Sequence, residues 1–190
     1  MNRTEFFDAV RHALLTEHII PISHAYWLTK HVHRNQVRDE GGRYFEHCRR
    51  VANILFDHPP TSASEIIVAL LHDCEEDGFL PEGLLDTLFN SNVARAVDLL
   101  SKVRVTFDGR TGRVIKEKKS LDWYFDAIAR AENMVRRVKC ADRIHNLSTM
   151  HGAWPPERKA KYIAETRMYL IPIAEITDTR LARLLHDACE

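Results

Sequence analysis

The stretch 70-LLHDCEED-77 decides how the rest of the chain is interpreted, because it takes an apolar helix directly into a cluster of ionisable side chains. At about 100° per residue, four of these side chains fall within an arc of roughly 140° on one side of the helix: His72, Asp73, Glu76 and Asp77. A divalent cation would relieve their mutual repulsion, since neutral imidazole and carboxylates together suit Mn, Fe or Zn. The alternative is an ordinary helix end that leads into a solvated acidic loop near Gly78.

The composition is typical of one globular domain. The chain has 190 residues, of which 45% are hydrophobic and 28% are charged, enough for one well-buried core and marginal for two. Lys plus Arg and Asp plus Glu number 27 each, so no overall field draws the protein to nucleic acid or to an anionic membrane. We therefore expect a single domain over 1–190, with no nucleic acid and no membrane as partners, and any polyanionic ligand would have to be bound by local charges.

The cysteines indicate a reducing compartment. Cys48, Cys74, Cys140 and Cys189 form no Cys-x-x-Cys pair. The N-terminus MNRTEFFDAVRHALL is a short amphipathic helix pattern that contains acidic residues and a histidine, so it indicates neither secretion nor membrane insertion. We expect a cytoplasmic protein with free thiols, some of which are small core residues.

The spacing of apolar residues predicts helices through the first half of the chain. Thr4 is expected to cap the first helix, and Pro21 is expected to separate it from the second. Ser62 or Ser64 caps the helix that carries the acidic cluster. The expected helices of this half cover residues 4–19, 23–37, 44–56 and 62–77.

The second half is predicted to be helical with one strand-like stretch. Pro81 opens a short helix, and Asn90 or Ser91 caps the next. The segment 105-VTFDGRTGRVI-115 alternates β-branched residues around glycines, which is typical of a small β-hairpin or of a mobile loop. Further helices are expected over 116–131, 132–150, 155–173 and 178–190. The fold class is therefore all-α, a single helical bundle with one hairpin or loop near 103–115.

A histidine is expected on the buried face of the third helix. His47 lies in the middle of an apolar stripe that consists of Tyr44, Val51, Ile54 and Leu55. A lone histidine on such a face is more often a satisfied core residue than a metal ligand. His47 therefore gains a functional meaning only together with other residues.

A second acidic position lies in 136-RRVKCADRIHNLSTM-150. Helical spacing places Asp142, Asn146 and Thr149 close to the inward face, and a buried acid needs a partner. Arg143 is one candidate partner for Asp142, as a structural ion pair. The functional alternative is that Asp142 completes a metal site begun by the 70–77 stretch.

Four stretches in order carry a resemblance to a known family: HRNQVRDEGGRYFEHCRRVANIL, LLHDCEED, VKCADRIHNLSTM and KYIAETRMYLIPIA. Their order, and nearly their spacing, resemble those of the motifs in the hydrolase domain of RelA/SpoT-type alarmone enzymes. These enzymes act in the stringent response, and the domain is one of the HD-domain phosphohydrolases. The resemblance covers about residues 30–174, so the chain looks like a small stand-alone alarmone hydrolase without synthetase and regulatory domains. It implies an all-α HD-type bundle that binds Mn²⁺ and removes the 3′-pyrophosphate from guanosine tetra- or pentaphosphate, (p)ppGpp.

Carried over by position, the resemblance implies roles for nine residues. The implied metal ligands are His47, His72, Asp73 and Asp142. Glu76 and Asp77 match an E-D pair that orients or deprotonates the attacking water and assists the leaving group. For substrate binding, the resemblance implies that Arg38 stacks on the base and that Asn146 and Thr149 contact the nucleoside.

The chain departs from the family pattern at Asp39, Arg43, Cys48 and Gly78, where a basic residue, two prolines and a threonine are usual. None of the four is an implied metal ligand, so hydrolase chemistry is unaffected. The changes around Arg38 lie where base and phosphates would bind, which keeps adenosine analogues such as (p)ppApp, or another 3′-phosphorylated nucleotide, open as substrates. A non-catalytic nucleotide sensor and a helical scaffold with core ion pairs are the alternatives to an enzyme.

Overall fold

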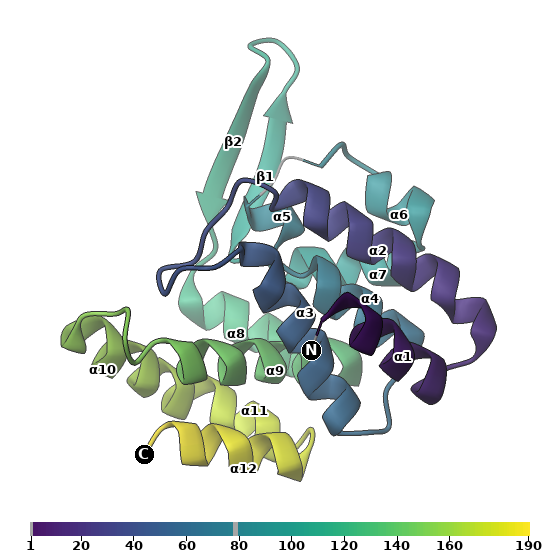
Figure 1. Ribbon diagram of the computed structural model, residues 1–190. Coiled ribbons are helices and arrows are strands. Elements are labelled where there is room, and N and C mark those ends of the chain that lie inside the picture. The colour runs from purple at the N-terminus through teal and green to yellow at the C-terminus, as the bar shows by residue number, and fades with distance from the viewer. Residues whose placement is uncertain (1, 78–79) are drawn as a thin grey trace.

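The computed structural model describes residues 2–77 and 80–190. It is a bundle of helices from which one antiparallel hairpin projects, as Figure 1 shows, and it confirms the expected fold class. Gly78, near which the acidic helix was expected to end, lies outside the described residues. Within the two described ranges, every helix is too short or too polar to cross a membrane.

The first half of the chain forms α1 (Arg3–Ala13), the 3-10 turn η1 (Thr16–His18), α2 (Ile19–Val32), α3 (Tyr44–Asp57), α4 (Ala63–Leu71), α5 (Cys74–Asp77), α6 (Leu84–Leu88) and α7 (Ser91–Leu100). The second half forms β1 (Val103–Asp108), β2 (Arg113–Lys118), α8 (Leu121–Arg130), α9 (Asn133–Thr149), α10 (Pro156–Glu165), the π-helical turn η2 (Thr166–Leu170), α11 (Ile171–Glu175) and α12 (Thr179–Ala188). The strands confirm the hairpin alternative over the loop. The hairpin extends to Lys118, so α8 begins later than the expected residue 116.

The N-terminal boundaries differ from the prediction. α1 is capped by Asn2, which forms a capping box with Glu5, and the helix ends at Ala13 rather than near residue 19. Pro21 does not separate two helices, because it lies in the first turn of α2, where backbone N–H groups have no intrahelical acceptor. The second helix therefore begins at Ile19 instead of Ser23.

The helix that carries the acidic cluster is interrupted. α4 stops at Leu71, and His72 and Asp73 form a turn before α5, so the expected continuous helix to residue 77 is wrong. Two side chains form hydrogen bonds with backbone carbonyl oxygens at the end of α4. His72 Nδ1 lies 2.8 Å from the carbonyl oxygen of Ala69, and Thr29 Oγ1 donates to that of Leu70 at 2.8 Å. These bonds compete with continuation of the helical ladder.

α4 is the central element of the bundle. Its residues from Glu65 to Leu71 are all buried, and it packs against α2, α3, α7 and α9. A helix that is buried on all sides has little freedom to shift, because close-packed neighbours restrain it. The end of α4 therefore holds His72 in a fixed position next to α3 and α9.

A buried ion network ties α9 to the start of α4 and to α12. Arg137 Nε donates to Glu65 Oε1 at 2.8 Å, its Nη2 donates to the carbonyl oxygen of His58 at 2.6 Å, and its Nη1 donates to Asp178. The side chains of the three charged residues are no more than 6% exposed. One guanidinium thus pairs with two carboxylates in the interior and satisfies a carbonyl group, and Arg180 supplies Asp178 with a second cation.

This network predicts a large loss of stability for Arg137→Ala. Removal of the guanidinium leaves Glu65 buried without the cation that it pairs with and leaves Asp178 only its bonds to Arg180, which costs about 3–5 kcal/mol. The matched control is Arg130→Ala, since Arg130 pairs with Asp126 on the surface of α8 and such pairs contribute about 1 kcal/mol or less. Urea denaturation of both variants measures the difference, and equal losses would contradict the prediction.

Candidate active site

Four ionisable side chains meet where α3, the 72–73 turn and α9 approach each other. His47 Nε2 lies 3.2 Å from His72 Nε2. Asp73 Oδ2 lies 3.5 Å from His47 Nε2 and 3.1 Å from His72 Nε2, and Asp142 Oδ1 lies 3.3 Å and 3.7 Å from the same two atoms. The structure therefore brings together all four residues that the sequence indicated as metal ligands.

These separations fit a shared divalent cation. Two ligands at right angles on an ion with bonds of about 2.1 Å lie about 3.0 Å apart, which is close to the distances in this cluster. His47, His72 and Asp73 each offer one ligand atom, and the three atoms lie within 4.8 Å of one another. Two imidazoles and two carboxylates also match the ligand preference of Mn, Fe and Zn. The donor set and its geometry thus fit a metal.

Both histidines are oriented by contacts of their second ring nitrogen. The bond of His72 Nδ1 to the Ala69 carbonyl oxygen places the proton on Nδ1 and leaves Nε2 as a ligand. His47 Nδ1 lies 2.8 Å from Nδ1 of His145. Burial, with repulsion from His47 and Arg38, lowers the pKa of His145 to about 3, so His145 is neutral. If Nε2 of His47 binds a metal, the proton of that ring is on Nδ1, which then donates to His145 Nδ1. His145 is a supporting residue that the sequence reasoning missed.

The charges of the cluster make it receptive to a cation. Burial alone would lower the pKa of His72, but Asp73 and Asp142 raise it to about 10. Burial alone would raise the pKa of Asp142, but Lys139 and the two imidazoles hold it well below the usual range. The carboxylates thus stay ionised and attract a positive charge, which is a proton on His72 when no metal is bound.

Asp142 has a different partner from the one expected. Lys139 Nζ donates to Asp142 Oδ2 at 2.9 Å, and Asn146 Nδ2 donates to Asp142 Oδ1 at 2.6 Å. Arg143 instead donates to Thr166 Oγ1 at 2.8 Å and to Glu165 at 2.5 Å. The expected pairing of Asp142 with Arg143 is therefore wrong. The actual partner, Lys139, lies one helical turn before Asp142, so the sequence could have indicated this ion pair.

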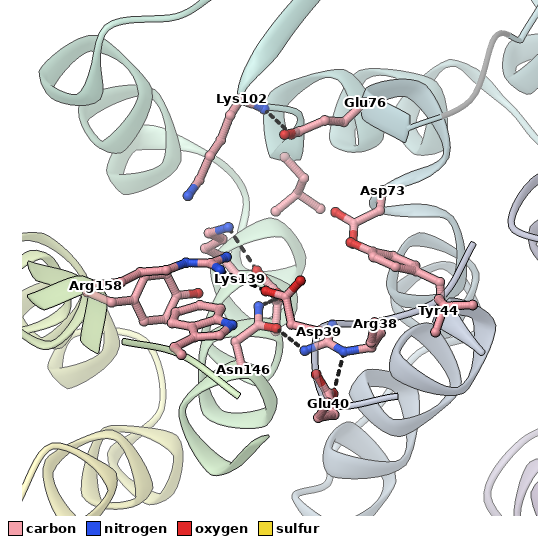
Figure 2. A pocket seen from close by; sticks show the side chains of 15 residues that line it. Arg38, Asp39, Glu40, Tyr44, Asp73, Glu76, Lys102, Lys139, Asn146 and Arg158 are labelled. Carbon is pink, nitrogen blue, oxygen red and sulfur yellow. Dashed lines mark hydrogen bonds and ion pairs between the residues drawn. The ribbon is translucent and has the colours of Figure 1, made fainter. Parts of the chain in front are cut away.

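A cavity of about 340 Å³ opens beside the cluster, a size within the range of small-molecule sites. Figure 2 shows that its walls come from the 33–43 loop, the start of α3, the 72–77 stretch, the 100–102 segment before β1, α9 and α10. Asp73 and Asp142 line it, whereas His47 and His72 lie buried behind them. The cavity therefore reaches the candidate metal centre from its carboxylate side.

The two acids of α5 have different environments. Glu76 lines the cavity, and its Oε2 accepts the backbone N–H of Lys102 at 2.8 Å. Burial, opposed by that hydrogen bond, raises the pKa of Glu76. Asp77 is exposed and is not among the lining residues. Because the helix is interrupted at 72–73, the four residues of the acidic cluster do not share one helix face. Of Glu76 and Asp77, only Glu76 lines the cavity.

The three predicted substrate-binding residues form one hydrogen-bonded group. Arg38 Nη2 donates to Asn146 Oδ1 at 2.9 Å and to Thr149 Oγ1 at 3.2 Å. Arg38 Nε donates to Glu40 Oε1 at 2.6 Å, and the guanidinium carbon lies 5.6 Å from the centre of the Tyr44 ring. Arg38 and Asn146 line the cavity, and Thr149 supports Arg38 from behind.

Several lining residues have no counterpart in the prediction. Tyr44 was expected in the core stripe of α3, but its side chain is half-buried and its hydroxyl donates to Asp73 Oδ2 at 2.7 Å. Its position one turn before His47 is the sequence signal for this contact. The cavity is also lined by Lys102, Lys139, Trp154, Arg158 and Tyr162.

Comparisons with known proteins agree with this fold and site. Residues 25–175 match the model of the HD-domain family. A relative from Arabidopsis thaliana, named a probable GTP diphosphokinase RSH3, chloroplastic, is 29% identical over 174 residues, which are 88% of this chain and 24% of the relative. A GTP pyrophosphokinase of Myxococcus xanthus is 35% identical over 154 residues, 80% of this chain and 20% of the relative. The chain thus spans between a fifth and a quarter of the length of these relatives.

A solved structure shares the fold. It is described as a metazoan orthologue of SpoT that hydrolyses ppGpp and plays a role in starvation responses. The TM-score is 0.73 at 20% sequence identity, and the match covers 88% of this chain and 93% of that protein. The likeness therefore covers nearly the whole of both chains.

The cluster predicts that a divalent cation raises the melting temperature and that Asp142→Asn or His72→Ala removes the effect. Binding to the folded state alone stabilises it by about 2.7 kcal/mol at a hundred times the dissociation constant. Each substitution removes a ligand, so the cation should bind much more weakly. Thermal scans with Mn²⁺, Fe²⁺ and Zn²⁺ test this, with Asp187→Asn on the exposed surface of α12 as control. Parental affinity in either ligand variant would show that the ligand assignment is wrong.

Proposed function

The chain belongs to the HD-domain family, and from this premise we propose that it is a metal-dependent phosphohydrolase that removes the 3′-pyrophosphate from (p)ppGpp-type alarmone nucleotides. The observation that carries the proposal is the cluster of His47, His72, Asp73 and Asp142 beside a cavity whose lining includes arginine and lysine side chains. The substrate class is supported by the structural neighbour, which is described as hydrolysing ppGpp. The relatives named as GTP pyrophosphokinases support a guanine nucleotide as the ligand, although their name denotes pyrophosphate transfer and not hydrolysis.

The metal site has a defined set of protein ligands in this proposal. His47, His72, Asp73 and Asp142 hold the ion, which we propose is Mn²⁺. A divalent ion held there supplies Lewis-acid activation of a phosphate oxygen and of a water molecule. Lys139 holds Asp142 by its Oδ2 atom, which directs Oδ1 toward the two imidazoles. Tyr44 donates to Asp73 Oδ2, the same oxygen that lies near both imidazoles, and so fixes its position directly.

Glu76 is the proposed proton-transfer group. It lines the cavity on the same side as Asp73, as Figure 2 shows, and its raised pKa moves it toward the range useful for general acid–base work. In the proposed reaction, Glu76 accepts a proton from the attacking water. The water oxygen bonds to the phosphorus of the 3′-diphosphate as the bond between that phosphorus and the ribose 3′ oxygen breaks. The 3′ oxygen takes up the proton held by Glu76 to become a hydroxyl group, and pyrophosphate is released.

Lys102 is the proposed phosphate-binding cation. Figure 2 shows its side chain directed into the cavity, and its Nζ lies 3.9 Å from Glu165 Oε1, beyond hydrogen-bond distance. Burial, with repulsion from Lys139 and Arg143, lowers the pKa of Lys102 to about 8. A bound phosphate would favour the charged form and supply the missing hydrogen-bond acceptor.

Arg38 is the proposed base-stacking residue at the other end of the cavity. Hydrogen bonds to Asn146, Thr149 and Glu40 fix the orientation of its guanidinium plane. A planar guanidinium can stack on an aromatic face while it keeps its charge. In this arrangement Thr149 acts through Arg38 and not on the substrate directly. Asn146 acts in the same way and also holds Asp142, so it links the base end of the cavity to the metal end.

The direct test is incubation of the purified protein with Mn²⁺ and a panel of 3′-pyrophosphorylated guanine and adenine nucleotides, with chromatographic separation of the products. Adenine nucleotides belong in the panel because Asp39, one of the departures from the family pattern, lines the cavity together with Arg38. We expect release of pyrophosphate that stops when the metal is chelated. Nucleotide binding without turnover would favour a sensor, and turnover unaffected by chelation would exclude the metal mechanism.

Glu76→Gln is expected to lower kcat by about 10²-fold or more while metal and nucleotide binding persist, since glutamine has the shape of glutamate but does not accept the proton. The neighbouring acid Asp77 is the matched control. Because Asp77 is exposed and does not line the cavity, Asp77→Asn should have the smaller effect. Single-turnover rates and nucleotide titration calorimetry separate the chemical step from binding. A parental kcat in Glu76→Gln would remove Glu76 from the mechanism.

Arg38→Ala is expected to raise KM by about tenfold or more, since stacking on a base contributes about 1–3 kcal/mol. Arg38→Lys should not restore KM, because lysine lacks the planar fork that bonds Asn146, Thr149 and Glu40 together. Arg34→Ala is the control, because Arg34 is exposed and bonds only a nearby carbonyl group. An unchanged KM in Arg38→Ala would indicate that the substrate is bound mainly through its phosphates.

A further inference from the structure

The two ends of the cavity differ in charge. At its mouth lie two guanidinium groups, Arg38 and Arg158, and two carboxylates, Asp39 and Glu40. Each guanidinium bonds one of these carboxylates, Arg38 to Glu40 at 2.6 Å and Arg158 to Asp39 at 2.7 Å. The mouth therefore carries no net formal charge, although it contains two arginines.

The pair of Asp39 and Arg158 joins opposite walls of the cavity. Asp39 belongs to the 33–43 loop and Arg158 to α10, and the side chains of both are about half exposed, at 51% and 54%. Arg158 is held in place because its guanidinium carbon lies 3.8 Å from the centre of the Trp154 ring, a close cation–π contact. Asp39 thus occupies the position on a fixed arginine where an anionic group of a ligand would otherwise bind.

The inner end of the cavity is different. Asp73 and Asp142 belong to the candidate metal centre, and the charge of a divalent ion would offset both carboxylates. Glu76 adds a third carboxylate, and Lys102 and Lys139 add two cations, so the inner end carries one net positive formal charge once the ion is bound. Lys102 has no acceptor within hydrogen-bond distance of its Nζ among the described contacts. Anionic groups are therefore favoured at the inner end, while the mouth offers balanced ion pairs.

We propose that Asp39 is a specificity-determining residue. By holding Arg158 it makes the site prefer 3′-pyrophosphorylated nucleotides with the fewest phosphates at the 5′ position. This inference rests on the proposed function and narrows its substrate class. A 3′ group at the metal directs the base and the 5′ arm of the same nucleotide toward the mouth. A neutral base or a 5′-hydroxyl leaves the ion pair of Asp39 and Arg158 intact, whereas a 5′-diphosphate must displace Asp39 and approach two carboxylates.

The test compares two substrates that differ only at the 5′ position, guanosine 3′-diphosphate and guanosine 3′,5′-bis(diphosphate), with the adenosine pair in parallel. For each protein, kcat/KM is measured with Mn²⁺, and the dissociation constants of both nucleotides are measured by calorimetry with the metal chelated. Calorimetry gives the preference without turnover. The variants are Asp39→Asn and Asp39→Asn with Arg158→Gln. Asp126→Asn is the control, since it removes one negative charge from the surface of α8.

The parent is expected to favour the nucleotide with the 5′-hydroxyl. Asp39→Asn frees Arg158 and should shift the preference toward the bis(diphosphate) by about tenfold or more, in kcat/KM and in affinity. The double variant should return to the parental preference, because it lacks the freed guanidinium, and Asp126→Asn should not differ from the parent.

Two results would overturn the inference alone: a parent that prefers the bis(diphosphate), or an Asp39→Asn variant with unchanged preference. Failure of every nucleotide to bind or to turn over would overturn it together with the proposed function. The failure of the specificity argument is therefore distinguishable from the failure of the hydrolase assignment.

Discussion

The rest of the structure depends on one constraint, which is that two carboxylates and two imidazoles converge in the interior of the bundle. Burial of ionised groups costs several kcal/mol each unless partners and hydrogen bonds compensate them. Lys139 and the Tyr44 hydroxyl compensate part of this cost, and a divalent cation would supply the remaining positive charge. The same constraint explains the interruption after α4. His72 bonds the Ala69 carbonyl oxygen, and that one hydrogen bond helps to end the helix, orients the ring and leaves its other nitrogen free for the metal.

Much of the fold could be predicted from local signals. Ser62, Asn90 and Asp178 cap the helices that the sequence assigned to them, because a cap is a contact within one turn. The convergence of His47 and Asp142 with the 70–77 stretch could be predicted only through the resemblance to a family, since nothing local brings three separate helices together. The structure confirms that they meet. The HD-domain assignment is likewise confirmed.

What the sequence did not reveal depends on tertiary contacts. The α4 helix was expected to continue because its residues favour helix, but His72 and the distant Thr29 take the carbonyl groups that would have extended it. Asp77 was expected to face the metal on the basis of that unbroken helix. Arg158 comes from α10 and Lys102 from the connection between α7 and β1, and no periodicity indicates that these segments border the same cavity. Pro21 was taken as a breaker although the first turn of a helix accepts proline.

The position of the metal centre determines where a substrate can bind, because the cavity reaches the centre from the side of Asp73 and Asp142 and is lined by cations near these carboxylates. The central claim is therefore that one divalent ion binds between α3, the 72–73 turn and α9. Anomalous diffraction from a crystal of the protein soaked in Mn²⁺ tests it most directly. The account predicts one strong manganese peak within bonding distance of His47, His72, Asp73 and Asp142. A strong peak elsewhere, or none at saturating Mn²⁺, would contradict it.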